Sequence, residues 1–353
     1  MIVVFCMLAA PCAAAEYGDA LGTDELEQAL PEAAEQALGA MTVENAELDS
    51  GLARIIDFLR EQLHGVLAEV LRPLSAVTAI TLLYAVLRPL QTAQGEFDPV
   101  SFGACVAVST AALGDVSSVF ALGQRTLQEL ADFSHALLPT LTAAACAAGA
   151  PTSAGVKYAA GALFSDFLLL AANDLVLPLI CAYTAAACAN AVLGGQLAGP
   201  VRFTAWSAKT LMKVLVLCFT GYLSLTGVIA SGADAAAVKT AKAAISTLLP
   251  VVGKTVADAS ESLVAGAGMI RNSVGVFGLL AALGVLALPL LRLGLRYLLF
   301  KAAAALLSSA AGDRLGKLID AIAGAYGMVL GLVGSGAVIL FLSVFSLIQT
   351  VSG

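Results

Sequence analysis

Six apolar segments, most of them near the length of a membrane-spanning helix, recur along this chain of 353 residues. They lie at about 73–90, 100–122, 158–193, 211–231, 274–291 and 324–349. A helix needs about 20 apolar residues to cross the hydrocarbon core of a bilayer. Hydrophobic residues make up 59% of the chain and charged residues 12%, whereas soluble domains average about 45–50% and about 25%. The sequence therefore excludes an ordinary soluble enzyme and predicts an all-α, polytopic bundle of membrane helices.

Some apolar segments do not fit a simple crossing. Segment 158–193 is too long for one straight span and contains Asn173, Asp174 and Pro178, so we expect it to bend. Segments 136–150 and 243–268 are apolar but short or interrupted by charge. Each fits a spanning, a re-entrant or an interfacial helix, and the pattern leaves these three alternatives open.

The first 15 residues have the pattern of a secretory signal peptide. A short apolar run ends in Ala13, Ala14 and Ala15 directly before Glu16, which matches a small-residue cleavage site. No Lys or Arg precedes Arg54, so the basic region expected before the apolar run is missing. We therefore predict a signal peptide at 1–15 and expect the true start to lie further upstream.

Charge divides the remaining chain into an acidic head and a membrane body. Residues 16–61 contain 12 of the 25 acids but only two of the 18 Lys and Arg residues. Between 52 and 71, apolar residues recur at helical spacing opposite charged ones, which is typical of an amphipathic helix on a membrane surface or on a partner. We predict an acidic extracytoplasmic segment at 16–72 that includes this surface helix, and a polytopic membrane domain at 73–353. A clustered basic footprint for nucleic acid is missing.

The distribution of basic residues predicts the orientation in the membrane. Segment 194–213 carries Arg202, Lys209 and Lys213 without an acid, and segment 292–323 carries five bases against two acids. By the positive-inside rule, both segments are cytoplasmic. Six spans then place 16–72 and the C-terminus outside, provided that 136–150 and 243–268 do not cross.

Two proline-containing patterns recur at one offset. A Leu-Leu-Pro sequence ends at Pro139 and again at Pro250, 111 residues later, and the Leu-Pro pair at Pro178 recurs at Pro289 with the same offset. We predict a duplication of roughly 100–193 onto 211–304 with parallel halves; a chance match between common residues is the alternative. We expect the four prolines to break or bend their helices. The hairpins at Pro139 and Pro250 should then pack together on the outer side, where extracytoplasmic partners would dock.

Motifs for catalysis or cofactor binding are missing from the sequence. Neither H-E-x-x-H nor G-x-S-x-G occurs, and Gly253-Lys254-Thr255 lacks the upstream glycine of a phosphate-binding loop. The histidines are His64 and His135 alone, and the five cysteines beyond residue 15 lie in apolar stretches without CxxC spacing, as expected of small buried hydrophobes. We therefore predict no catalytic residue, no cofactor and no metal, and hence a protein that is not an enzyme.

Polar residues inside apolar segments are the remaining candidate site. Asp115 lies in the second span, and Asp166, Asn173 and Asp174 lie in segment 158–193. An ionisable group in the bilayer costs at least about 2.5–3.5 kcal/mol, so it normally faces the bundle or water. The functional interpretation is a polar lining of a conduit or a coupling site. The structural interpretation is an interhelical pair, with Arg292 or Arg296 as partner, or a group that reaches the interface.

One stretch of the chain resembles a known family. The run Val238-Lys239-Thr240-Ala241-Lys242 is followed by LLPVVG at 248–253, then Asp258, then NSVGV at 272–276. Together with the signal peptide, the acidic segment and the membrane body, this pattern resembles the stage III sporulation protein AE family over about 50–350.

The resemblance implies a role in endospore formation without enzymatic activity. Members of this family look like membrane subunits of a channel or secretion-like apparatus that links mother cell and forespore and is needed for forespore development. The resemblance also implies a multi-pass protein of the mother-cell-derived membrane around the forespore. Its partners would come from the same operon, namely an ATPase, small membrane proteins and a ring-forming protein, besides membrane lipid.

A protein of a different class remains as an alternative. The predicted repeat and the intramembrane acids also suggest a stand-alone secondary transporter of an unknown small solute. Transporters more often contain inverted repeats, whereas the halves predicted here are parallel.

Overall fold

The computed structural model describes residues 23–39, 41–90, 98–147, 151–248 and 253–349. These residues form helices with short connections. The elements are α2 (Thr23–Gln28), α3 (Glu32–Leu38), the 3-10 turn η1 (Val43–Asn45), α4 (Leu48–Leu87), the 3-10 turn η2 (Arg88–Leu90), α5 (Pro99–Ala147), α6 (Pro151–Ala171), the π-helical turn η3 (Ala172–Val176), α7 (Leu177–Val192), α8 (Ala198–Leu248), α9 (Gly253–Ala311) and α10 (Asp313–Ile348). The predicted signal peptide at 1–15 lies outside the described residues.

Six helical stretches in the described part of the chain are long and apolar enough to cross a membrane. They are Leu48–Leu87, Pro99–Ala147, Thr152–Val192, Ala198–Ser224, Asn272–Ala311 and Asp313–Ile348. The all-α prediction is confirmed, and the six stretches agree with a polytopic membrane bundle. The 59 residues of α9 extend over about 88 Å at 1.5 Å per residue, far beyond the roughly 30 Å of a hydrocarbon core. Part of the bundle must therefore project from any bilayer that it crosses.

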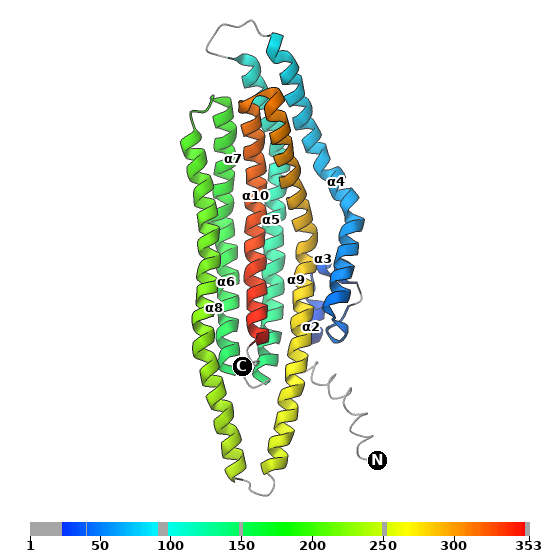
Figure 1. Ribbon diagram of the computed structural model, residues 1–353, viewed down its shortest axis with the longest axis vertical. Coiled ribbons are helices and arrows are strands. Elements are labelled where there is room, and N and C mark those ends of the chain that lie inside the picture. Colours follow the sequence, from blue (N-terminus) through cyan, green and yellow to red (C-terminus); the bar gives the residue numbers. More distant parts are fainter. Residues whose placement is uncertain (1–22, 40, 91–97, 148–150, 249–252, 350–353) are drawn as a thin grey trace.

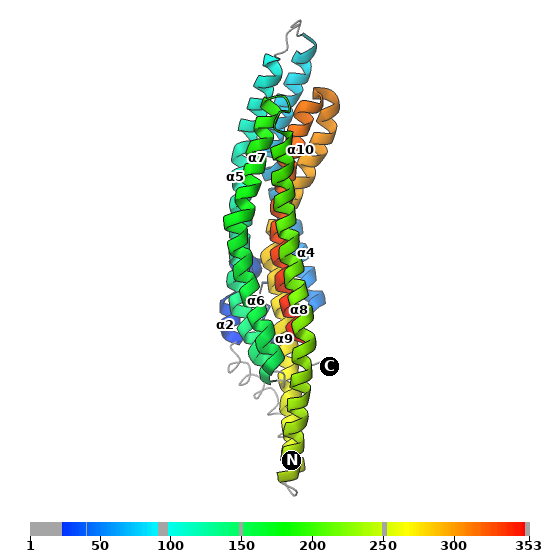
Figure 2. The same cartoon turned by 90° about the vertical axis from the view of Figure 1, so that its left-hand side faces the viewer.

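The long helices run side by side along the long axis of the molecule (Figure 1). At the upper end in Figure 1, α4 is followed by α5, α7 by α8, and α9 by α10. The lower ends of α5 and α8, the acidic helices α2 and α3, and the C-terminus lie toward the opposite end (Figures 1 and 2). The segments 194–213 and 292–323, which carry the basic residues, therefore both lie in the upper part of the bundle.

The two C-terminal helices form the centre of the bundle. The most apolar stretches of α9 and α10 are 67% and 61% buried, against 17–39% for the other four spans. Glycines allow the helices to approach closely, as in other membrane bundles. A Cβ atom added at Gly123 of α5 would lie 2.5 Å from Val329 Cγ1 of α10, and one at Gly336 of α10 would lie 2.8 Å from Leu127 Cδ2 of α5.

The acidic head packs against this centre instead of standing apart from it. A Cβ atom added at Gly284 of α9 would lie 3.0 Å from the Cα atom of Ala34 in α3. The predicted amphipathic helix over 52–71 leads without interruption into the first predicted span, because α4 continues through Pro73. The amphipathic segment and the first predicted span therefore belong to one continuous helix of 40 residues.

The prolines are accommodated within helices. No break occurs at Pro139, because α5 continues through it to Ala147. The hydroxyls of Thr140 and Thr142, just after the proline, donate to the carbonyls of Ala136 and Leu138, just before it. Pro289 lies inside α9, and Pro178 is the second residue of α7, directly after η3. Pro250 lies outside the described residues.

Candidate functional site

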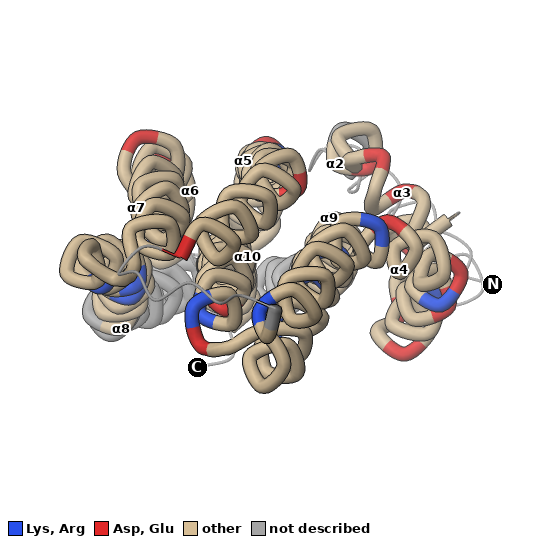
Figure 3. Tube along the Cα trace, turned by 90° about the horizontal axis from the view of Figure 1, so that it is seen from above, with Lys and Arg blue, Asp and Glu red and all other residues tan. Residues whose placement is uncertain are grey.

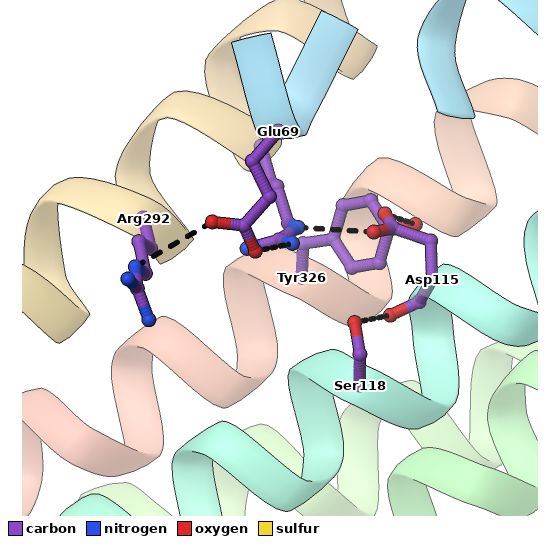
Figure 4. A network of polar contacts seen from close by, with 6 residues as sticks. Glu69, Asp115, Ser118, Arg292 and Tyr326 are labelled. Atoms are coloured by element: carbon purple, nitrogen blue, oxygen red, sulfur yellow. Dashed lines mark hydrogen bonds and ion pairs between the residues drawn. The ribbon is translucent and has the colours of Figure 1, made fainter. Parts of the chain in front are cut away.

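A buried arginine on α9 holds together a network of charged and polar side chains from four helices. The Arg296 side chain is only 4% exposed. Its Nε donates to Asp115 Oδ1 on α5 at 3.1 Å, and its Nη2 donates to Glu69 Oε1 on α4 at 2.7 Å. Figure 4 shows Glu69 and Asp115 of this network together with Arg292 and Tyr326, with dashed lines for their contacts.

Two further side chains complete the network. The Tyr326 hydroxyl on α10 donates to Asp115 Oδ2 at 2.6 Å, so both carboxylate oxygens of Asp115 have a partner. Arg292, one turn before Arg296, forms an ion pair with Glu69 at 3.6 Å. The two arginines and two acids balance in charge. This lowers the cost of burying the charges, although it does not remove the loss of hydration.

Close packing fixes the geometry of the network. Tyr326 is fully buried, and its ring meets Phe300 of α9 edge to face with centroids 5.0 Å apart. Next to it, Gly327 leaves room for the ring of Tyr297, since a Cβ atom there would lie 3.0 Å from Cδ2 of that tyrosine. The α9–α10 contact thus holds the tyrosine rigidly against Asp115.

The arrangement is suited to holding helices and not to chemistry. It contains no nucleophile next to a base, and the described residues include no group of three or more His, Cys, Asp or Glu side chains that could hold a metal. An apolar cavity of about 10 Å³ lies between Leu127, Leu168 and Gly336, which is room for one water at most. What the network does provide is a fixed register between α4, α5, α9 and α10.

Asp115 is paired with Arg296 on another helix. This pairing agrees with the structural interpretation of Asp115 and not with a polar lining. Asp166 lies elsewhere, with its Oδ1 3.0 Å from His135 Nε2, and both side chains are largely exposed in the single chain. Asp174 is also exposed. The described contacts therefore do not join Asp115 to Asp166 or Asp174.

Asn173 has an unusual backbone setting. It lies in the π-helical turn η3, and its Oδ1 atom is buried without a hydrogen-bond partner among the described residues. Single π-helical turns interrupt helices most often at functional positions. We expected segment 158–193 to bend, and the π-helical turn lies within it, just before Pro178.

The cysteines differ from the expectation of burial. Cys105 is buried, whereas Cys146, Cys181 and Cys218 are exposed, and none of these four forms a disulfide within the described residues. In a membrane helix a small apolar side chain can face lipid as readily as protein, so burial does not follow from hydrophobicity.

Two members of the network, Glu69 and Tyr326, were not predicted from the sequence. Glu69 matched the polar face of an amphipathic helix, and Tyr326 stood at the edge of an apolar span. The only signal for Glu69 was its position four residues before Pro73, where the charged part of α4 meets its apolar part.

Comparison with known proteins identifies relatives along most of the chain. A family model described as stage III sporulation protein AE matches residues 37–351. A curated relative, stage III sporulation protein AE of Bacillus subtilis (strain 168), is 24% identical over 256 residues, which cover 70% of this chain and 63% of the relative. The chain therefore spans less than two thirds of the length of that relative. No solved structure matches.

Proposed function

Because the chain belongs to the stage III sporulation protein AE family, we propose that it is a non-enzymatic membrane subunit of a channel or secretion-like apparatus linking mother cell and forespore. The family match across 37–351 is the observation that carries the proposal. The network around Arg296 agrees with it, because its charges pair with one another and join helices of the bundle. In this role the protein is needed for forespore development.

The proposal includes location and partners. The chain would lie in the mother-cell-derived membrane around the forespore as a multi-pass protein. It would assemble with proteins of the same operon, namely an ATPase, small membrane proteins and a ring-forming protein. Lipid would surround its apolar faces, and nucleic acid would have no part.

Orientation and ancestry belong to the same proposal. Residues 1–15 act as a signal peptide, and the upper end of the bundle is cytoplasmic, since Arg202, Lys209 and Arg314 lie there. The acidic segment within 16–72 then lies outside. The halves 100–193 and 211–304 derive from a duplication, and the region near Pro139 and Pro250 is where outer partners dock.

One observation favours a stand-alone secondary transporter as a second function. The π-helical turn at Ala172–Val176 interrupts a spanning helix beside Asn173 and Asp174, and interrupted helices form the ion sites of many transporters. Asp115 gives no support, because both of its oxygens already have partners.

Complementation tests the proposal. The gene would replace its relative in a spore-forming bacterium, and heat-resistant spores would be counted with and without the companion genes of the operon. We expect spores to form only when the companions are present. Solute uptake by the purified chain in liposomes, together with spore formation that is independent of the companions, would contradict the proposal and support a transporter.

A further inference from the structure

One side of α8 carries a basic stripe. Arg202, Lys209 and Lys213 are seven and four residues apart, spacings that place them on one side of a helix, and all three are exposed. Within the described part of the chain, neither lysine forms an ion pair. Val214 and Leu217 beside them are exposed apolar residues, so the stripe borders a surface that is suited to lipid.

A second stripe, on α5 and α6, is acidic and hydrogen bonding. Gln128 Nε2 donates to Asp132 Oδ1 at 3.0 Å, and His135 contacts Asp166 at 3.0 Å. These side chains are exposed, and so are the apolar neighbours Leu163, Phe167 and Leu170 of Asp166.

The π-helical turn brings Asp174 onto the same side as Asp166. Eight residues separate the two, and two turns of a regular α-helix take only about 7.2 residues. The π-helical turn at Ala172–Val176 contains about one residue more than an α-helical turn. Two full turns counted from Asp166 therefore end close to Asp174. Asp166 and Asp174 therefore extend the acidic stripe upward.

The two stripes lie at matching heights along the bundle. Phe164 of α6 meets Phe219 of α8 with ring centroids 5.1 Å apart, which fixes a common level. At 1.5 Å per residue, Lys213 lies about 9 Å above this level and Lys209 about 15 Å above it. Asp174 also lies about 15 Å above it. Asp132, one turn above the His135–Asp166 contact, lies about 7–8 Å above it.

The two stripes carry opposite charges. Both adjoin exposed apolar side chains, so a contact between them would bury apolar surface and pair charges across it. Seen from above, acidic positions on α5 and α6 lie along one long side of the bundle, whereas α8 lies toward the other (Figure 3). The stripes of one copy therefore cannot neutralise each other.

We propose that a second copy of this chain covers these stripes, with α8 of one copy packed on the α5–α6 seam of the next. Lys213 then faces Asp132 and Lys209 faces Asp174 across the contact. The two surfaces differ, so each copy uses one surface to bind the preceding copy and the other to bind the next. Successive copies are then related by a rotation about an axis parallel to the helices, and they form a closed ring if this rotation divides a full turn. This inference does not depend on the proposed function, because the contact is a property of the chain alone.

Crosslinking between two tagged copies tests the geometry. In a cysteine-free background, one copy carries Asp132→Cys and the other Lys213→Cys, and both are co-expressed in membranes. We expect a disulfide dimer between the tags. The matched control is Phe203→Cys, which is also exposed but lies about 15 Å further up α8, and which should yield little dimer with Asp132→Cys. A dominant product between two Asp132→Cys copies, a product with another protein, or no protein product at all would overturn the proposal.

Charge exchange provides a second measurement that does not depend on cysteine chemistry. In purified full-length protein in detergent, Lys213→Glu and Asp132→Lys should each weaken self-association by about three- to tenfold, as expected for one interhelical polar contact in a membrane protein. Combining the two changes in one chain should restore it, because every contact then regains opposite charges. Monomeric wild-type protein, or a double variant no better than the singles, would contradict the proposal.

Discussion

The guanidinium of Arg296 lies 3.1 Å from the carboxylate of Asp115, although 181 residues separate them in the chain. The pair joins α5 to α9 at a buried position, where an unpaired charge would be strongly destabilising. Glu69 and Tyr326 add α4 and α10 to the same point. The network therefore sets the register of four helices and provides the clearest target for mutation.

Replacing Arg296 by Gln should destabilise the bundle strongly. Asp115 would lose its charged partner while remaining buried, and breaking a buried ion pair typically costs about 3–5 kcal/mol. The measurement is the free energy of unfolding in detergent. Arg202→Gln serves as the control, because Arg202 is exposed and should change stability by less than about 0.5 kcal/mol. Equal losses in the two variants would contradict the structural role of the network.

Removing both charges should cost less than removing one. The double variant Arg296→Met with Asp115→Leu leaves no unpaired charge between these two positions, and apolar replacements of buried pairs are often neutral or stabilising. We expect its stability to exceed that of Arg296→Met alone, with Glu69 free to reach solvent at its 45% exposed side chain. A double variant less stable than the single one would show that packing dominates over charge.

Two glycines of α5 should respond in opposite ways to alanine. At Gly123 a Cβ atom would lie 2.5 Å from Val329 Cγ1, whereas at Gly114 nothing lies within 4 Å. We expect Gly123→Ala to cost about 1–3 kcal/mol through overpacking. Gly114→Ala should be neutral or gain up to about 1 kcal/mol from helix propensity. Thermal unfolding of both variants decides this, and similar effects at the two sites would argue against the α5–α10 contact.

The exposed acids should matter for function more than for stability. Asp166→Asn and Asp174→Asn should accumulate to wild-type levels, because neither side chain is buried, and should still impair forespore development. The measurements are immunoblotting of membranes and spore counts, with Asp49→Asn in the acidic head as control. Normal sporulation of both variants would show that these two acids of the acidic stripe are not needed for function.

Orientation can be read by labelling a single cysteine. Ser207→Cys in a cysteine-free background lies between Arg202 and Lys209, which the positive-inside rule places in the cytoplasm. We expect no reaction with an impermeant thiol reagent in intact cells and full reaction after lysis. Labelling in intact cells would reverse the orientation proposed for the whole bundle.

The sequence predicted the helices better than their continuity. Each of the six predicted apolar segments overlaps one of the six helical stretches that are long and apolar enough to cross a bilayer. Pro139 was expected to break or bend its helix, yet α5 passes through it. Proline disturbs an isolated helix, but neighbouring helices and threonine hydroxyls compensate within a bundle.

The charged network could be predicted only in part. Asp115 was a predicted site residue because it is an acid within an apolar span. Arg296 was one of the two arginines considered as its ion-pair partner. Glu69 lies 227 residues from Arg296 and Tyr326 lies 211 from Asp115. No local periodicity encodes such distances, since tertiary packing alone brings these side chains together.

The most direct test of the central claim, that this chain acts as one subunit of a larger sporulation apparatus, is a pull-down from sporulating cells. Full-length tagged protein would be purified in mild detergent, and the membrane proteins bound to it identified by mass spectrometry, with an unrelated tagged membrane protein as control. The account predicts that proteins of the same sporulation operon co-purify in fixed proportion. Recovery of the chain without any of them, from cells that contain them, would contradict it.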